Sequence, residues 1–173
     1  MKFEDYIWCF PILFMFHDFE EVIFMKPWFS NREEKILKKF PKFAPSLIEH
    51  FNKVSQAGFA FAVAIIFVLV SVVTITASIF DFYLIWLGLF GVYLLHLFVH
   101  CIQAIVLKDY VPSLVTSVIC IPVSCWILQI VLSNVSYSGA AIAITVIISG
   151  VVAIVGVFGL HKMIEHFMQL NIK

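Results

Sequence analysis

Charged side chains are scarce in this sequence. Asp, Glu, Lys and Arg make up 13% of the 173 residues, whereas hydrophobic residues make up 62% and aromatic residues 16%. A soluble domain of ordinary composition carries about a quarter charged residues, because its surface must contact water. The composition therefore excludes an ordinary soluble domain and indicates an integral membrane protein. The formal net charge is zero, so we expect no overall basic field and no nucleic-acid partner.

Cysteine pairs and familiar catalytic motifs are also missing. The four cysteines form no CxxC pair and lie within apolar runs, so we interpret them as small buried hydrophobic residues. The sequence contains no GxSxG, no HExxH and no phosphate-binding glycine loop. Its six histidines are scattered, which argues against the histidine-rich boxes of a di-iron desaturase.

Long hydrophobic runs dominate what is present. A membrane-spanning helix needs ~20 mostly apolar residues to cross ~30 Å of hydrocarbon. Four runs meet this requirement easily, at residues 57–79, 82–107, 111–132 and 139–160. A further run at residues 6–25 is also long enough. The sequence thus predicts one all-α domain over residues 1–173, a polytopic transmembrane helical bundle of about five spans.

The first run is unusual because it carries His17, Asp18, Glu20 and Glu21. An acidic residue near the centre of a membrane helix costs ~3 kcal/mol on insertion scales. We predict a helix here, and a full span if the acids lie near one end or inside the bundle. Only Lys2 precedes the run as a basic residue, and no small-residue cleavage site follows it, so we expect no cleaved secretory signal.

Basic residues predict the orientation. The loop at residues 30–53 is the most polar stretch and is rich in lysine, and such loops stay in the cytoplasm. With about five spans, every Lys and Arg except Lys2 then lies inside, the N-terminus outside and the C-terminus in the cytoplasm. Within the loop, residues 31–40 have an amphipathic pattern that Pro41 and Pro45 should break. A helix on the inner leaflet and a solvated loop remain alternatives.

His17, Glu20 and Glu21 form the first group of candidate functional residues. They share one helix face, because residues three and four positions apart lie on the same side. Ionisable side chains inside a bilayer are costly and usually functional. An imidazole beside two carboxylates is a metal half-site, an acid–base pair or a proton relay. The structural alternative is a helix end that emerges into water.

Two further groups have helical spacing. His96, His100 and Gln103 share a face of the third run, and two histidines four residues apart can chelate one divalent metal. The alternative is a pair of buried histidines bonded to neighbouring helices. His161 and Glu165 have the same spacing beyond the last run, where we favour a solvated helix end.

Depth in the membrane connects these groups. At a rise of ~1.5 Å per residue, His17 and His100 both lie ~12–13 Å from the predicted inner ends of their helices. His161 lies at the inner edge beside Lys162. One shared site in the cytoplasmic half explains this coincidence better than separate burials, and helical bundles build metal sites from inward His and carboxylates in this way.

The sequence HDFEE at residues 17–21 resembles the motif of the HXXEE-domain family, which are integral membrane proteins of bacteria. A second stretch, His100 to Gln103 followed by YVPSLVT at residues 110–116, is similar to the family's later histidine and a Tyr-x-Pro-Gly-Leu-x-Thr-like turn. The resemblance covers residues 1–130 or so. Two positions depart from it: His96 stands where asparagine is expected, which bears on the ligand set, and Ser113 stands where glycine is usual.

The resemblance implies a multi-helix protein of the bacterial plasma membrane in which certain residues are functional. It carries no established reaction. The residues to which it assigns a function are His17, Glu20, Glu21 and His100.

Together these features predict a small intramembrane enzyme, a hydrolase or transferase that acts on a lipid or other apolar substrate with zinc, iron or manganese. The predicted metal ligands are His17, Glu21, His96 and His100. Glu20 and Glu21 are the predicted catalytic carboxylates, one of which would activate a metal-bound water. The further candidates are Gln103, His161 and Glu165.

Two other functions use the same polar groups. A transporter or proton-coupled permease component would bind an ion or relay protons through them. A non-catalytic accessory protein would use them only to fix helix packing. In each case the expected partner is membrane lipid, with a homo-oligomer as an open alternative.

Overall fold

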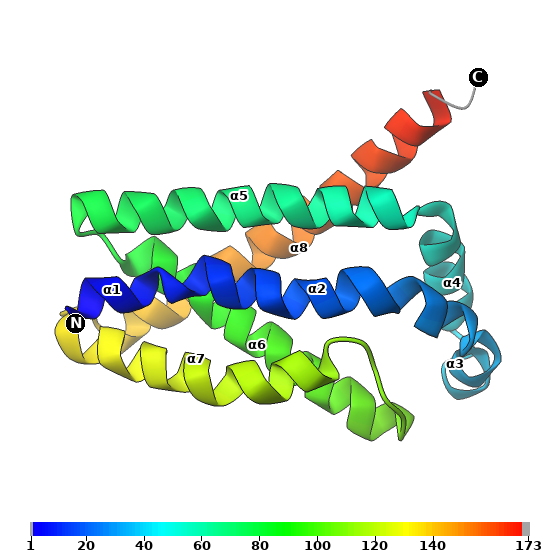
Figure 1. The fold of residues 1–173 in the computed structure, drawn as a ribbon, viewed down its shortest axis with the longest axis horizontal. Coiled ribbons are helices and arrows are strands. Elements are labelled where there is room, and N and C mark those ends of the chain that lie inside the picture. The colour runs from blue at the N-terminus through cyan, green and yellow to red at the C-terminus, as the bar shows by residue number, and fades with distance from the viewer. Residues whose placement is uncertain (1, 171–173) are drawn as a thin grey trace.

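The computed structural model describes residues 2–170, without the side chains of residues 47, 50–52, 161 and 165–170. No strand occurs in this part of the chain, so the predicted all-α fold is confirmed (Figure 1). The helices are, in chain order, α1 (Phe3–Ile7), α2 (Cys9–Ser30), α3 (Glu33–Lys39), α4 (Ala44–Lys53), α5 (Gln56–Phe80), α6 (Leu84–Leu107), α7 (Leu114–Asn134) and α8 (Gly139–Leu170).

Within the described residues, four helices are long and apolar enough to cross a membrane, namely α5, α6, α7 and the Gly139–Ile164 part of α8. The chain is therefore a multi-pass membrane protein. The helix α2 is not among the four, although α1 and α2 together run beside α5 along the bundle (Figure 1). Its side chains His17, Asp18 and Glu20 are buried in the bundle. Burial of this kind is the condition on which a further span was predicted; that span and the orientation of the termini stay predictions.

An aromatic layer holds α2 against α6 in the half of the bundle that carries α1. The Phe10 ring of α2 meets the Phe90 and Trp86 rings of α6 edge-on, with centroid distances of 5.1 and 5.7 Å. Trp86 and Phe90 stack at 4.6 Å, and all three side chains are buried. Offset and edge-to-face pairs are the favoured aromatic geometries. This layer fills the space between the two helices next to the polar groups of α2.

Small residues let α8 approach α6. A Cβ atom built on Gly88 of α6 would lie 2.5 Å from Ser149 Oγ and 2.7 Å from Thr145 Cγ2 of α8. It would also lie 3.1 Å from the Thr145 carbonyl oxygen. Close backbone approach through small residues is typical of helix pairs in membranes, where packing replaces the hydrophobic drive.

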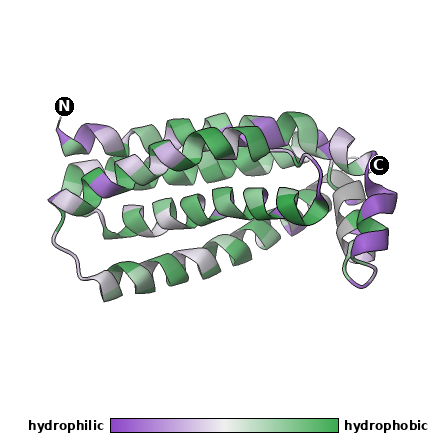
Figure 2. Ribbon diagram, turned by 90° about the horizontal axis from the view of Figure 1, so that it is seen from below, coloured by the Kyte–Doolittle hydropathy of each residue, from purple (hydrophilic) through white to green (hydrophobic). Residues whose placement is uncertain are grey.

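Polar residues gather at the end of the bundle that carries α3 and α4, while the long helices are mostly hydrophobic (Figure 2). The predicted amphipathic helix is α3, and its Ile36 packs with Phe29 and Ala44. As predicted, α3 ends before the two prolines, at Lys39. Pro45 lies in the first turn of α4, where proline loses no backbone hydrogen bond.

Basic residues of this end clamp the loop between α6 and α7. Lys35 Nζ and Arg32 Nε lie 2.6 and 3.4 Å from Asp109 Oδ2 and hold the pKa of that carboxyl at about 2. The Trp28 indole nitrogen donates to the Tyr110 carbonyl oxygen at 2.6 Å. Lys39 donates to the Val106 carbonyl oxygen. The loop is thus tied to α3 immediately beside the polar groups of α2.

The close contact between α6 and α8 predicts that a methyl group added at Gly88 destabilises the protein. We expect Gly88→Ala to lower the free energy of unfolding by ~1–3 kcal/mol, the usual cost of overpacking. Rotating Thr145 away would break its hydroxyl bond to the Ala141 carbonyl at 2.8 Å. Thermal unfolding in detergent measures the change.

Gly156→Ala is the matched control, because nothing lies within 4 Å of a Cβ there. Alanine is favoured over glycine in helices by up to ~1 kcal/mol, so this variant should be neutral or more stable. Equal destabilisation by both variants would contradict the contact.

Candidate metal centre

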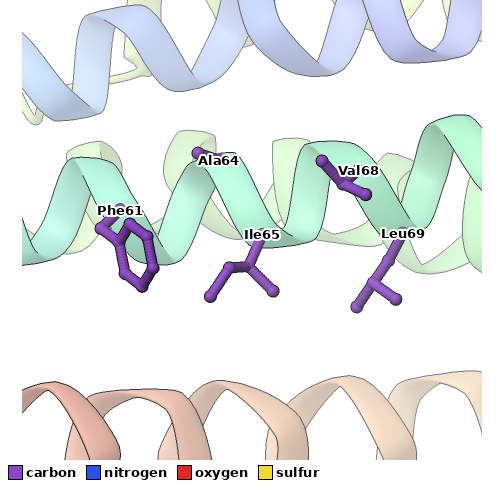
Figure 3. Close-up of a pocket in the computed structure, with 5 residues that line it drawn as sticks. All are labelled: Phe61, Ala64, Ile65, Val68 and Leu69. Carbon is purple, nitrogen blue, oxygen red and sulfur yellow. The ribbon is translucent and has the colours of Figure 1, made fainter.

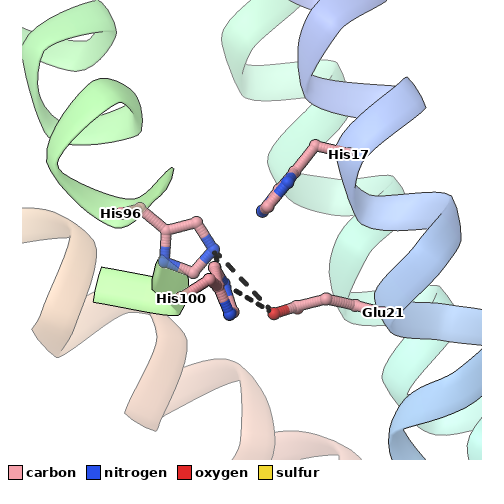
Figure 4. Close-up of side chains that lie close together, drawn as sticks. All are labelled: His17, Glu21, His96 and His100. Atoms are coloured by element: carbon pink, nitrogen blue, oxygen red, sulfur yellow. Dashed lines mark hydrogen bonds and ion pairs between the residues drawn. The ribbon is translucent and has the colours of Figure 1, made fainter. Parts of the chain in front are cut away.

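Two helices each supply a pair of polar side chains to one point in the bundle. His17 and Glu21 lie one turn apart on α2, and His96 and His100 lie one turn apart on α6. Each side chain offers a ligand atom, and these four atoms lie within 4.8 Å of one another. Figure 4 shows the two histidines of α6 turned toward Glu21 and His17 across the space between the helices.

The individual distances describe a tight group. His100 Nε2 lies 3.0 Å from Glu21 Oε1 and 3.0 Å from His96 Nε2. His96 Nε2 lies 3.9 Å from Glu21 Oε1. The His17 ring centroid lies 5.1 and 5.3 Å from those of His100 and His96. Three imidazoles and one carboxylate therefore converge, and we call these four residues the His–Glu cluster.

The His–Glu cluster is enclosed on most sides. His17 is fully buried and His100 nearly so. The Glu21 side chain is 12% exposed, whereas that of His96 is 44% exposed. The cluster thus opens on the His96 side, where the α6 neighbours Leu95 and Val99 are also exposed.

Thr116 of α7 connects the cluster to Glu20. The Thr116 hydroxyl lies 3.2 Å from His17 Nδ1 and donates to Glu20 Oε2 at 2.7 Å. The Thr116 backbone N–H donates to the same oxygen at 2.8 Å, and the Tyr110 hydroxyl donates to Glu20 Oε1 at 2.6 Å. Both Glu20 oxygens are therefore engaged outside the cluster, through the α6–α7 loop and the first turn of α7.

The residues present fit a divalent metal ion. Histidine nitrogens and carboxylate oxygens bind zinc at about 2.0–2.2 Å, so a tetrahedral zinc site places its donors roughly 3.3 Å apart. The 3.0 and 3.9 Å separations in the cluster bracket that spacing. His17 Nε2 is buried without a hydrogen-bond partner among the described residues. Buried polar atoms are rarely left so, unless a ligand or ordered water takes them.

The structure separates the sequence candidates into groups. It brings together His17, Glu21, His96 and His100, and so places His96, the departure from the family pattern, inside the cluster. Glu20 lies beside the cluster with its carboxylate bonded elsewhere, and Gln103 is exposed on α6. The side chains of His161 and Glu165 lie outside the described residues.

Sequence reasoning missed the roles of Thr116 and Tyr110. Both belong to the YVPSLVT stretch at residues 110–116, which showed only a family resemblance. Their shared hydrogen-bond partner, Glu20, lies 90 residues before Tyr110 and 96 residues before Thr116 in the chain. No helical spacing can therefore indicate either contact. The available signal was that Tyr110 and Thr116 lie in a stretch that resembles the same family as HDFEE.

The backbone at Ser113 fits the glycine that the family resemblance implies at this position. It precedes α7 with a φ of 71° and a ψ of 4°, the left-handed region that favours glycine. Its side chain is fully buried and its hydroxyl oxygen has no partner in the described part of the chain. After this turn, the Thr116 backbone N–H in the first turn of α7 donates to Glu20 Oε2.

A hollow among the described residues is lined by side chains without polar groups. It is a groove of about 280 Å³ along α5, lined by Phe61, Ala64, Ile65, Val68 and Leu69. Figure 3 shows these side chains on the α5 surface next to another helix. Every lining side chain is a hydrocarbon, so these residues offer no polar group.

Comparison with known proteins identifies one family. The family described as "Protein of unknown function with HXXEE motif" matches residues 8–127. No curated protein and no solved structure matches the chain. The matched region contains the whole His–Glu cluster together with Glu20, Tyr110 and Thr116.

The left-handed turn predicts opposite effects for two Ser→Gly changes. Ser113 and Ser117 are both fully buried, with hydroxyls that have no hydrogen-bond partner among the described side chains, but Ser117 lies within α7. Glycine relieves the backbone at position 113 and weakens the helix at position 117. We expect the free energies of unfolding to differ by ~1–2 kcal/mol in favour of Ser113→Gly. Thermal unfolding in detergent tests this, and an equal or more stable Ser117→Gly would contradict it.

Proposed function

We infer that this chain, which belongs to the HXXEE family, holds a divalent metal ion in its His–Glu cluster and acts as an intramembrane enzyme. The substrate class is a lipid or another apolar molecule, and the reaction is hydrolysis or group transfer. The observation that carries the proposal is the convergence of three imidazoles and a carboxylate from α2 and α6 within 4.8 Å.

A role in helix packing explains the cluster poorly. His100 Nε2 faces both His96 Nε2 and Glu21 Oε1 at 3.0 Å, yet a neutral imidazole nitrogen carries at most one proton. The buried His17 Nε2 gains nothing from packing, since it has no partner among the described residues. Replacing buried polar groups with apolar residues is often neutral or stabilising. Metal binding gives each of these atoms a favourable partner.

Glu21 is the carboxylate available for chemistry. Glu20 already accepts three hydrogen bonds from Tyr110 and Thr116, whereas the Glu21 oxygen faces the histidines. A bound metal supplies Lewis-acid polarisation of water or of a substrate carbonyl or phosphoryl oxygen. With the metal held by the three imidazoles, the Glu21 carboxylate would stay free to take the proton from the attacking water.

The surroundings of the cluster favour an apolar substrate. The side toward α1 is filled by the buried rings of Phe10, Trp86 and Phe90, and the side toward α3 is covered by Tyr110 on Glu20. The exposed His96 side borders Leu95 and Val99, hydrocarbon side chains of a membrane helix. A substrate dissolved in the bilayer can approach along this surface. The aromatic layer also disfavours a solute or proton path through the bundle.

Elemental analysis of purified, tag-free protein tests the metal. We expect near-stoichiometric zinc, iron or manganese in the wild type and its loss in His17→Ala and His100→Ala. Gln103→Ala, an exposed neighbour on α6, is the control that should retain the metal. Added metal should also raise the unfolding temperature of the wild type, by an amount equivalent to ~2.7 kcal/mol at one hundred times Kd. A wild type that takes up no metal after add-back would overturn the proposal.

Glu21→Gln separates catalysis from binding. We expect hydrolysis of labelled phospholipids in mixed vesicles to fall by ~10²–10⁴-fold in this variant, because the proton acceptor is lost. Metal content measured on the same samples should stay above that of His100→Ala. If wild-type protein with full metal leaves every vesicle lipid and ester probe unchanged, the enzymatic part of the proposal is wrong.

A further inference from the structure

We propose that Thr116 and Glu20 are positioning residues that hold His17 in the tautomer with the proton on Nδ1, so that Nε2 faces the cluster as a bare lone pair. The significance of this tautomer for a metal rests on the proposed function. The assignment of the tautomer itself rests only on the hydrogen bonds around one hydroxyl group, that of Thr116.

The Thr116 hydroxyl has one proton to donate and three neighbours. Glu20 Oε2 lies at 2.7 Å, the Ser113 carbonyl oxygen at 3.4 Å and His17 Nδ1 at 3.2 Å. A carboxylate and a carbonyl oxygen only accept hydrogen bonds. The hydroxyl proton goes to Glu20 Oε2, because two oxygen atoms 2.7 Å apart repel each other unless a proton lies between them. The bond with His17 then forms only if Nδ1–H donates to the hydroxyl oxygen.

The other ring nitrogen of His17 then has no proton. His17 Nε2 is buried without a hydrogen-bond partner among the described residues, next to the rings of His96 and His100. Metal-binding histidines almost always donate their second ring N–H to a neighbouring acceptor, which fixes both tautomer and ring orientation. Thr116 provides that acceptor from a third helix, α7.

Glu20 fixes the orientation of the Thr116 hydroxyl because it accepts hydrogen bonds from both the hydroxyl and the backbone N–H of Thr116. The first N–H groups of a helix lack partners within the helix, and the N-cap residue Ser113 makes no side-chain cap bond. Glu20 of α2 accepts from the Thr116 N–H at 2.8 Å in its place. A negative charge at a helix N-terminus is also favoured by the helix dipole. One carboxylate thus caps α7 and fixes the direction of the Thr116 hydroxyl.

The first test uses metal-free wild-type protein in nanodiscs with ¹⁵N-labelled histidine. Nitrogen NMR, with His17→Gln for assignment, shows which ring nitrogen carries the proton. We expect His17 to be protonated at Nδ1 alone. A His17 protonated at Nε2 would overturn the inference, and this arm needs neither a variant of Thr116 nor a bound metal.

The second test compares substitutions of the hydroxyl. Thr116→Val should give mixed His17 tautomers and weaken zinc binding ~10–100-fold, measured by competition with a chromophoric chelator. Thr116→Ser keeps the hydroxyl and should restore both readouts. Thr74→Val is the matched control, because it also removes a buried hydroxyl, one that bonds within α5 to the Val70 carbonyl.

The outcomes separate the two proposals. Wild-type protein that shows the Nδ1–H tautomer but binds no zinc, iron or manganese overturns the proposed function and supports the tautomer assignment. Zinc binding that is equal in wild type and Thr116→Val, with an unchanged His17 signal, overturns the positioning role and leaves the metal centre in place.

Discussion

The burial of carboxylates in an apolar helical bundle is the constraint on which the rest of this structure depends. An ion removed from water and left unpaired costs several kcal/mol, and Glu20 and Glu21 both face the interior from α2. The chain gives them different environments. Glu20 receives three hydrogen bonds from Tyr110 and Thr116, whereas Glu21 lies among three imidazoles. The first arrangement satisfies a carboxylate completely, and the second leaves one able to bind or accept a proton.

The loop between α6 and α7 is shaped by the first of these environments. Tyr110 must reach Glu20 while α7 begins close enough for the Thr116 N–H to donate to it. The chain meets both needs with a left-handed residue at Ser113 and with Asp109 held by Lys35 and Arg32. Contacts of the α6–α7 loop therefore determine how Thr116 meets His17. This explains why YVPSLVT and HDFEE, distant in the chain, meet around the same carboxylate.

Much of the geometry of the site was accessible to sequence reasoning, and what spacing did not show has physical causes. Helical spacing predicted correctly that His17 and Glu21, and separately His96 and His100, share a face, because side chains four residues apart lie on one side of a helix. The same spacing also grouped Glu20 with the site and Gln103 with His100. Spacing shows only the direction of a side chain from its own helix. It does not show that α7 supplies the partners of Glu20, or that the α6 surface at Gln103 is exposed.

By itself, the sequence determined that this is an all-α membrane protein. The length and apolarity of each hydrophobic run are local properties, and they decide whether a helix can span the hydrocarbon core of a bilayer. It also determined which residue types were available for a polar site. The tertiary structure alone decided which of them meet: His96 enters the cluster at the position where it departs from the family pattern, and Glu20 turns away to bind Thr116. The physical reason is that these contacts join residues 75 to 99 positions apart in the chain, and their geometry depends on how α2, α6 and α7 pack.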